Sequence, residues 1–235
     1  MITEAIILAG GFGTRLQPVV SNVPKSMAPV HGRPFLEYLL DYLISQGIRK
    51  VVLSVGYKSQ AIRDHFGPVY RDLDMAYAAE TEPLGTGGGI RNAFRLTEGE
   101  EAFVLNGDSI FKVGLAEMYR FHISNQGFLT LALRHVDQTG RFGSVRLDPF
   151  SRIIGFAEKS ETAGPGYING GVYILRKDFI LNEIFPDQFS IEKDCFELYF
   201  KDVTMLGFLS EGYFLDIGIP GDYERANHEF DRLGS

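Results

Sequence analysis

Short apolar runs rich in β-branched residues alternate with amphipathic segments through the first half of this chain. Between Pro34 and Gly47, for example, apolar side chains recur at the spacing of one helix face, with the proline near the first turn and the glycine just after the end. The alternation predicts β-α-β units around a mostly parallel, buried sheet that helices cover. The strands expected in this half are 4–8, 50–55, 74–78 and 102–107.

The pattern changes from about residue 128. Strand-like segments then follow one another across short breaks, which predicts a mixed extension of the sheet. These segments are 128–136, 144–148, 152–158 and 170–176. A helix at 190–200, a strand near 203–208, the segment 213–218 and a closing helix at 222–230 complete the chain. No repeat or linker divides it, so we expect a single domain over 1–235, with a soft division into halves at 1–127 and 128–235.

Composition limits the partners and the compartment. With 235 residues and 45% hydrophobic content, the chain is long enough for one sizeable core. The formal net charge of -7 argues against a nucleic-acid partner, because such binding depends on clustered cations. A single cysteine, Cys195, excludes an internal disulfide, and we find neither a signal-peptide pattern nor an apolar run of membrane length. We therefore expect a cytoplasmic protein without a membrane partner.

A glycine loop, "LAGGFGTRL", follows the first expected strand. It is not a dinucleotide fingerprint, because Leu16 occupies the place of the third glycine and the second strand ends without an acidic residue. It is not a P-loop either, because no G-K-[ST] follows at the required spacing. What remains is bare backbone followed by two cations, Arg15 and Lys25, which suits a triphosphate. The alternative is a plain tight turn with a solvated arginine.

Further segments extend this pattern to almost the whole chain. In order they are "PKSM" (24–27), "EPLGTGGGIRNA" (82–93), "LNGDS" (105–109), "EKS" (158–160), "NGGVYIL" (169–175) and "FLDIGIPGDYERA" (214–226). With the glycine loop they resemble the sugar-1-phosphate nucleotidylyltransferase family, whose pattern is G-G-x-G-T-R-L and then P-K-P-[ML]. Ser26 replaces the second proline of that pattern and leaves Lys25 in place. The resemblance implies a Rossmann-like α/β three-layer sandwich, here without the C-terminal β-helix of many larger relatives.

The resemblance also implies a reaction and its residues. A sugar 1-phosphate oxygen would attack the α-phosphate of a nucleoside triphosphate and release pyrophosphate. The catalytic residues implied are Arg15, Lys25 and Asp108. The nucleotide-binding residues implied are Leu8, Ala9, Gly10, Gly11, Gly13, Thr14, Glu80, Pro83, Gly85, Thr86 and Gly107, with the first half of the chain holding the nucleotide. The sugar-phosphate residues implied, in the second half, are Gly143, Glu158, Lys159, Asn169 and Gly170.

A metal site is expected at two carboxylates. Asp108 follows an expected strand, where open α/β sheets place ligand-binding groups, and Asp216 follows another apolar run. Carboxylate oxygens suit Mg²⁺, so the two are expected to hold this cofactor against the triphosphate. Taken alone, an aspartate in such a place is more often a turn or capping residue.

Glu80 favours GTP as the nucleotide. A carboxylate accepts from both N–H groups on the guanine edge, whereas uracil presents one N–H beside carbonyl acceptors. Glycines 85 and 87–89 are expected to leave bare backbone for the base and ribose. Within the family the motifs are most similar to those of members that act on a heptose 1-phosphate, whose product would feed a cell-surface glycan pathway.

Several alternatives stay open at this stage. Within the family they are a uridylyltransferase and a mannose-1-phosphate guanylyltransferase. Outside it they are a metal-dependent glycosyltransferase and an inactive regulatory protein that binds a nucleotide sugar. The sequence also leaves a homodimer open, because its many aromatic residues suit either a core or an interface.

Overall fold

The structure is a computed structural model that describes residues 1–11, 16, 23–56, 58–157, 164–182 and 184–230. Four parallel strands form the centre of its main sheet, in the order β7-β1-β4-β6. They are β1 (Glu4–Leu8), β4 (Lys50–Val55), β6 (Leu73–Ala79) and β7 (Glu101–Asn106). All four strands expected in the first half are confirmed, with bounds that differ by at most one residue.

The second half extends the same sheet with antiparallel pairs. The long strand β12 (Gly166–Arg176) pairs with β7 and also with β9 (Leu129–Val136), and β9 pairs in parallel with β13 (Met205–Leu209). A hairpin of β10 (Ser144–Leu147) and β11 (Ile153–Ala157) lies at one edge, and β5 (Val69–Tyr70) lies at the other. The expected mixed extension is therefore confirmed.

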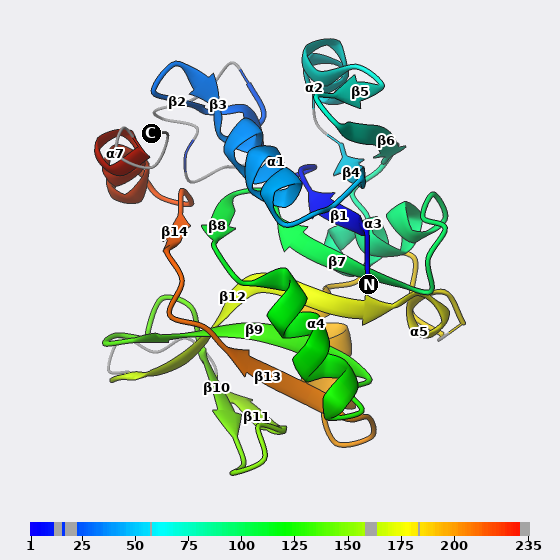
Figure 1. The fold of residues 1–235 in the computed structure, drawn as a ribbon, viewed down its shortest axis with the longest axis vertical. Coiled ribbons are helices and arrows are strands. Elements are labelled where there is room, and N and C mark those ends of the chain that lie inside the picture. The colour runs from blue at the N-terminus through cyan, green and yellow to red at the C-terminus, as the bar shows by residue number, and fades with distance from the viewer. Residues whose placement is uncertain (12–15, 17–22, 57, 158–163, 183, 231–235) are drawn as a thin grey trace.

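Helices cover both faces of the sheet, because residues along the central strands point alternately to two cores. Ile7 belongs to one core and Ile6 to the other. The first core packs under α1 (Phe35–Ser45), α2 (Ser59–Phe66), α4 (Leu115–Ser124) and α7 (Pro220–Glu229). The second packs under α3 (Gly85–Phe94), α5 (Lys177–Asn182), the π-helical turn η2 (Ile191–Phe196) and α6 (Glu197–Tyr199). Figure 1 shows α1 and α4 in front of the sheet, and the three-layer α/β sandwich is confirmed.

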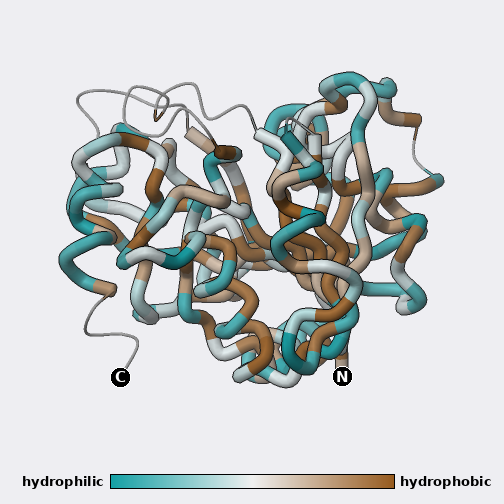
Figure 2. The backbone as a smooth tube through the Cα atoms, turned by 90° about the horizontal axis from the view of Figure 1, so that it is seen from above, coloured by the Kyte–Doolittle hydropathy of each residue, from teal (hydrophilic) through white to brown (hydrophobic). Residues whose placement is uncertain are grey.

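Segments made of hydrophobic residues gather in the interior, and segments made of hydrophilic residues lie towards the outside (Figure 2). None of the helices in the described part of the chain combines the length and the apolar character of a membrane span.

Two small sheets stand apart from the main one. The strands β8 (Ser109–Phe111) and β14 (Phe214–Asp216) form an antiparallel ribbon, and β2 (Pro29–Val30) pairs with β3 (Arg33–Pro34). The ribbon joins the segment just after β7 to a segment from the far end of the chain. It therefore places Asp216 beside the end of a central strand.

One expectation about the glycines is wrong. Gly87, Gly88 and Gly89 do not leave bare backbone for a ligand, because they are buried inside helix α3. A side chain at Gly87 would collide with the ring of Phe189, and one at Gly89 would meet the hydroxyl of Ser54. The glycines are thus explained by close packing within the protein, which compensates for their poor helix propensity.

Candidate active site

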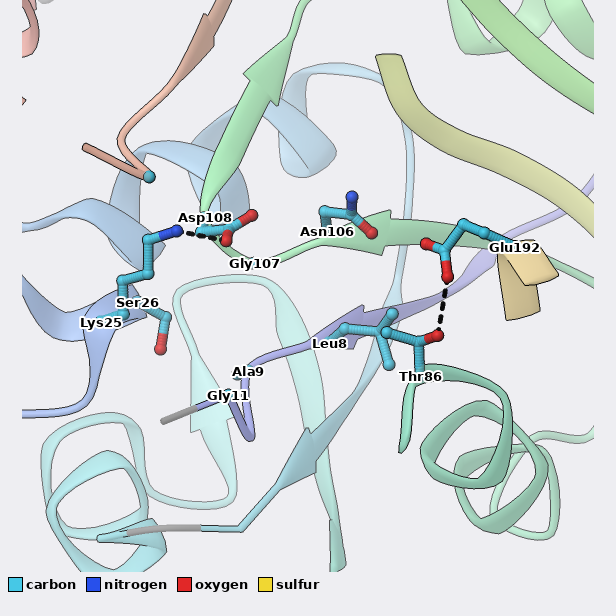
Figure 3. Close-up of a pocket in the computed structure, with 11 residues that line it drawn as sticks. Leu8, Ala9, Gly11, Lys25, Ser26, Thr86, Asn106, Gly107, Asp108 and Glu192 are labelled. Carbon is cyan, nitrogen blue, oxygen red and sulfur yellow. Dashed lines mark hydrogen bonds and ion pairs between the residues drawn. The ribbon is translucent and has the colours of Figure 1, made fainter. Parts of the chain in front are cut away.

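A pocket of about 270 Å³ opens at the carboxyl ends of β1 and β7. Figure 3 shows the end of β1, the segment after β7 and the start of α3 facing one another across it. Its lining residues are Leu8, Ala9, Gly11, Lys25, Ser26, Thr86, Asn106, Gly107, Asp108, Glu192 and Gly218. The carboxyl edge of a parallel sheet is where such folds bind ligands.

Main-chain bonds fix the start of the glycine loop against its neighbours. The Ala9 N–H donates to the Ser54 carbonyl at 2.8 Å, and the Gly107 N–H donates to the Leu8 carbonyl at 2.9 Å. A Cβ at position 107 would collide with that Leu8 carbonyl, so only glycine allows this approach. The first glycines and Asp108 are thereby held in segments that follow the adjacent strands β1 and β7.

Lys25 lies between the two predicted metal ligands. It begins the 3₁₀ turn η1 (Lys25–Met27), and its ammonium lies 2.5 Å from Asp108 Oδ2 and 4.0 Å from Asp216 Oδ1. Its side chain is only 10% exposed. Three residues that the sequence placed in one site, from positions 25, 108 and 216, are therefore brought together.

Backbone pairing and a second cation hold Asp216 in place. In the ribbon it lies opposite Ser109, and the next N–H, of Ile217, donates to the Asp108 carbonyl at 2.9 Å. The Gly218 N–H donates to Asp216 Oδ1 at 2.5 Å. Arg141 lies 3.4 Å from Asp216 Oδ2 and also pairs with Asp222 of α7. Arg141 was not predicted from the sequence as a site residue.

The donor set fits a divalent cation. Burial raises the pKa of Asp216, and the Asp108 carboxylate raises it further, while Lys25 opposes the change. A cation near Asp216 would favour its charged form, and the oxygens of both carboxylates are hard ligands that suit Mg²⁺. Among the described residues no cluster of three or more histidine, cysteine or acidic side chains forms a complete metal cage. A metal here would take its remaining oxygens from substrate or water.

A further carboxylate at the pocket, that of Glu192, was not predicted from the sequence. Glu192 of η2 lines the pocket beside Thr86, whose hydroxyl donates to Glu192 Oε2 at 2.9 Å. The Ser190 hydroxyl donates to the same oxygen at 2.9 Å, and the Ile191 N–H donates to the Thr86 hydroxyl at 2.9 Å. Thr86 was a predicted nucleotide residue, but its partner is 106 positions away and no spacing signals it.

Asn106 and Gly218 also line the pocket and were not predicted. Both lie in motifs that the sequence did signal, "LNGDS" and "FLDIGIPGDYERA", next to the residues that were chosen.

Glu80 and Pro83 lie in the segment that leads into α3, Gly85 is the first residue of that helix, and none of the three lines the pocket. The carboxylate of Glu80 accepts from the Ser54 hydroxyl at 2.9 Å and from the Leu84 N–H at 3.1 Å. Gly85 has φ +72°, and a Cβ there would lie 2.5 Å from the Phe189 carbonyl oxygen. Gly10 approaches the same region, since a Cβ there would lie 3.4 Å from Glu80 Oε1.

Asn169 and Gly170, which the family resemblance implied as sugar-phosphate residues, are not part of a turn. Both residues lie within β12, where the pairing with β9 is irregular between Asn169 and Tyr173. The Gly171 N–H donates to Asn169 Oδ1 at 2.9 Å, and Asn169 Nδ2 donates to the buried Tyr173 hydroxyl at 3.0 Å. A bulge uses an Asn-Gly-Gly segment for the same conformational reason as a turn, so the sequence signal is shared.

The remaining predicted residues are Gly143 and a set outside the described residues. Gly143 has φ +78° and lies in the loop before β10, two positions after Arg141. The predicted residues outside the described part are Gly13, Thr14, Arg15, Glu158 and Lys159.

Lys25, Asp108 and Asp216 thus meet at the carboxyl edge of a parallel sheet, where α/β proteins of this architecture bind their ligands. The nucleotidyl transferase family profile matches residues 4–232. The chain therefore belongs to the nucleotidyl transferase family.

Individual relatives match over nearly their full length. A D-glycero-α-D-manno-heptose 1-phosphate guanylyltransferase from Aneurinibacillus thermoaerophilus is 47% identical over 226 residues, which cover 96% of this chain and 97% of the relative. The crystal structure of HddC from Yersinia pseudotuberculosis matches with a TM-score of 0.87 at 36% identity, over 97% of this chain and 100% of that one. HddC complexed with GMP-PN matches with a TM-score of 0.85 at 35% identity and the same coverage.

Proposed function

We propose that this protein transfers the guanylyl group of GTP to D-glycero-α-D-manno-heptose 1-phosphate, giving GDP-heptose and pyrophosphate. The observation that carries the proposal is the 47% identity, over 96% of this chain, to a relative named for that activity. The complex of HddC with GMP-PN, a guanine nucleotide analogue, supports the choice of base. The cluster of Lys25, Asp108 and Asp216 supports the choice of reaction.

The reaction needs charge neutralisation and no general base. A sugar 1-phosphate is already an anion at pH 7, since the second pKa of a phosphate monoester is about 6. One of its oxygens forms a bond to the α-phosphorus of GTP, the bond from that phosphorus to the β-bridging oxygen breaks, and pyrophosphate leaves with the electron pair. Lys25, already at the pocket, meets this charge, and Arg15 of the glycine loop is proposed to assist.

Asp108 and Asp216 are proposed to hold Mg²⁺. When bound, this ion would neutralise phosphate charge and orient the α-phosphate. Lys25 is the counter-charge of both carboxylates in this structure. We propose that its ammonium turns to the leaving pyrophosphate when the nucleotide is bound.

Specificity is proposed to come from two regions. Glu80 is proposed to accept from the guanine N–H groups, since each of its oxygens has a second lone pair beyond the bonds from Ser54 and Leu84. The second half of the chain, through Gly143, Glu158, Lys159, Asn169 and Gly170, is proposed to hold the sugar phosphate. Lys159 would meet its phosphate and Glu158 its hydroxyls.

A substrate panel tests the proposal. The purified protein is incubated with Mg²⁺, each of the four nucleoside triphosphates and the 1-phosphates of the heptose, mannose and glucose, and product is read by mass spectrometry alongside pyrophosphate release. We expect GTP with heptose 1-phosphate to give the highest kcat/KM. Preference for mannose 1-phosphate or for UTP would overturn the substrate assignment, and GDP release from a GDP-sugar would overturn the reaction.

Two further expectations belong with this proposal. We propose a cytoplasmic location, where GTP is made and used. We also propose a homodimer, which light scattering on the eluted protein tests directly.

A further inference from the structure

Ser26 carries a hydroxyl that the protein itself does not use. The residue is only 3% exposed, and it lines the pocket one position after Lys25. Within the described part of the chain, its Oγ is the one buried side-chain nitrogen or oxygen without a hydrogen-bond partner. A buried polar group without a partner destabilises the protein that contains it, so this one calls for an explanation.

The local fold does not require this serine. Ser26 lies in the single 3₁₀ turn η1, where the Met27 N–H donates to the Pro24 carbonyl at 2.8 Å. The first residues of a helical turn need no N–H of their own, and proline is therefore accepted there. The family pattern has proline at this position, and what serine adds is a hydroxyl in the pocket wall.

The direction of the side chain indicates what the hydroxyl meets. In Figure 3 the Lys25 ammonium points to Asp108, whereas the Ser26 hydroxyl points away from that pair. It is therefore not placed to join the carboxylates at the proposed metal site. Ser26 shares the pocket lining with Lys25 and with Gly11 at the start of the glycine loop, the groups proposed to surround the leaving pyrophosphate.

We propose that the Ser26 hydroxyl donates a hydrogen bond to an oxygen of the β- or γ-phosphate of GTP. This inference rests on the proposed function and adds to it one nucleotide-binding residue in which this chain departs from the family pattern. The hydroxyl lacks a partner in the free protein because its partner arrives with the nucleotide. Binding then satisfies a group that was already desolvated, so little of the interaction is lost to removing water.

Ligands that differ in their phosphates test the inference. Affinities of wild type and Ser26→Ala are measured by calorimetry for a non-hydrolysable GTP analogue, for inorganic pyrophosphate and for GMP. We expect the variant to bind the analogue and pyrophosphate about 10–100-fold more weakly, the range for a hydrogen bond to a charged group, and to bind GMP as wild type does. In turnover the KM for GTP should rise while the KM for the sugar phosphate stays the same.

The thermal stability of the free protein provides a second test, because Ser26→Ala should bind the GTP analogue more weakly without losing stability. Removing a hydroxyl that has no partner should leave the unfolding midpoint of Ser26→Ala unchanged or raise it. Thr97→Val is the matched control, because the Thr97 hydroxyl is buried just beyond the end of α3, outside the pocket lining, and donates to the Phe94 carbonyl at 2.9 Å. This control should lower the midpoint and leave the affinity for the GTP analogue unchanged. Ser26→Pro, which restores the family residue, should reproduce the affinity loss of the alanine variant.

Each other outcome overturns the inference. Unchanged affinity for pyrophosphate, an equal loss for GMP, or a rise confined to the KM for the sugar phosphate would each remove Ser26 from the β,γ-phosphate site. A lower unfolding midpoint with normal affinity would make the serine structural. Failure of the proposed function is distinct, since the wild type would then not form GDP-heptose whatever the effect of Ser26→Ala on pyrophosphate binding.

Discussion

Replacing Lys25 by methionine should destabilise the free protein, and Mg²⁺ should reverse most of the loss. The variant keeps the length of the side chain and removes the charge that lies 2.5 Å from Asp108 and 4.0 Å from Asp216. With an effective dielectric constant of about 20, these distances correspond to gross attractions of about 7 and about 4 kcal/mol. Burial of Lys25 and water at Asp108, whose side chain is 37% exposed, offset most of that sum.

We therefore expect a net loss of about 3 kcal/mol, the lower end of the range for breaking a buried ion pair. For a chain of this size that loss lowers Tm by about 6–12 °C. Thermal unfolding followed by circular dichroism, with EDTA and with Mg²⁺, measures it. In Lys25→Met the ion meets two carboxylates that no longer have a lysine as competitor, so Mg²⁺ should raise Tm more than it does in wild type.

Lys50→Met is the matched control. Lys50 also lies between two carboxylates, 3.4 Å from Glu4 and 2.8 Å from Glu98. Lys50 and Glu4 are at the amino ends of β4 and β1, whereas the pocket is at the carboxyl ends of the strands. The control should lose stability without any added response to Mg²⁺. The reasoning is refuted if Lys25→Met melts with wild type in EDTA, or if both variants respond to Mg²⁺ alike.

Three further variants test the site. Asp108→Asn should lower kcat by at least about 100-fold, as loss of a charge-stabilising group does, with an unchanged circular dichroism spectrum; near-normal turnover would remove Asp108 from the proposed metal site. Glu80→Gln should lower kcat/KM for GTP by about 10–100-fold. Its Tm should stay close to that of wild type, because the Ser54 hydroxyl, which donates to Glu80, can instead accept a hydrogen bond from the new amide. Equal activity with GTP would show that another group selects the base. Gly85→Ala should cost at least about 2 kcal/mol in urea unfolding, since its φ of +72° and the nearby Phe189 carbonyl both oppose a side chain; a stability equal to wild type would contradict the backbone conformation described.

The centre of the fold was predictable from the sequence because its signals are local. The runs that form β1 and β4 are β-branched and apolar, and each is bounded by glycine or charged residues, so their limits match the predicted ones. The approach of Lys25, Asp108 and Asp216 followed from ordered family motifs, since nothing local links positions so far apart.

What escaped prediction depends on distant packing. A segment with glycines at 85 and 87–89 forms the start of α3. The ring of Phe189, which stacks on Phe185 at 4.5 Å, occupies the space that a side chain at Gly87 would fill. The pairing of Thr86 with Glu192 joins α3 to η2 and has no periodic signal. An Asn-Gly-Gly segment such as the one at Asn169 is typical of both a bulge and a turn. Only the pairing of β12 with β9 shows that this segment lies within a strand.

The ribbon of β8 and β14 sets the spacing of Asp108 and Asp216 through main-chain bonds, with Asp216 opposite Ser109 and Ile217 bonded to the Asp108 carbonyl. Such bonds do not depend on which side chains surround them. Substitutions in the pocket wall, around Thr86 for example, can accumulate without moving the carboxylates. Under the proposed roles, the main chain positions the two carboxylates, whereas side-chain contacts such as that of Thr86 with Glu192 shape the pocket, so substitutions there should change substrate preference more readily than the reaction.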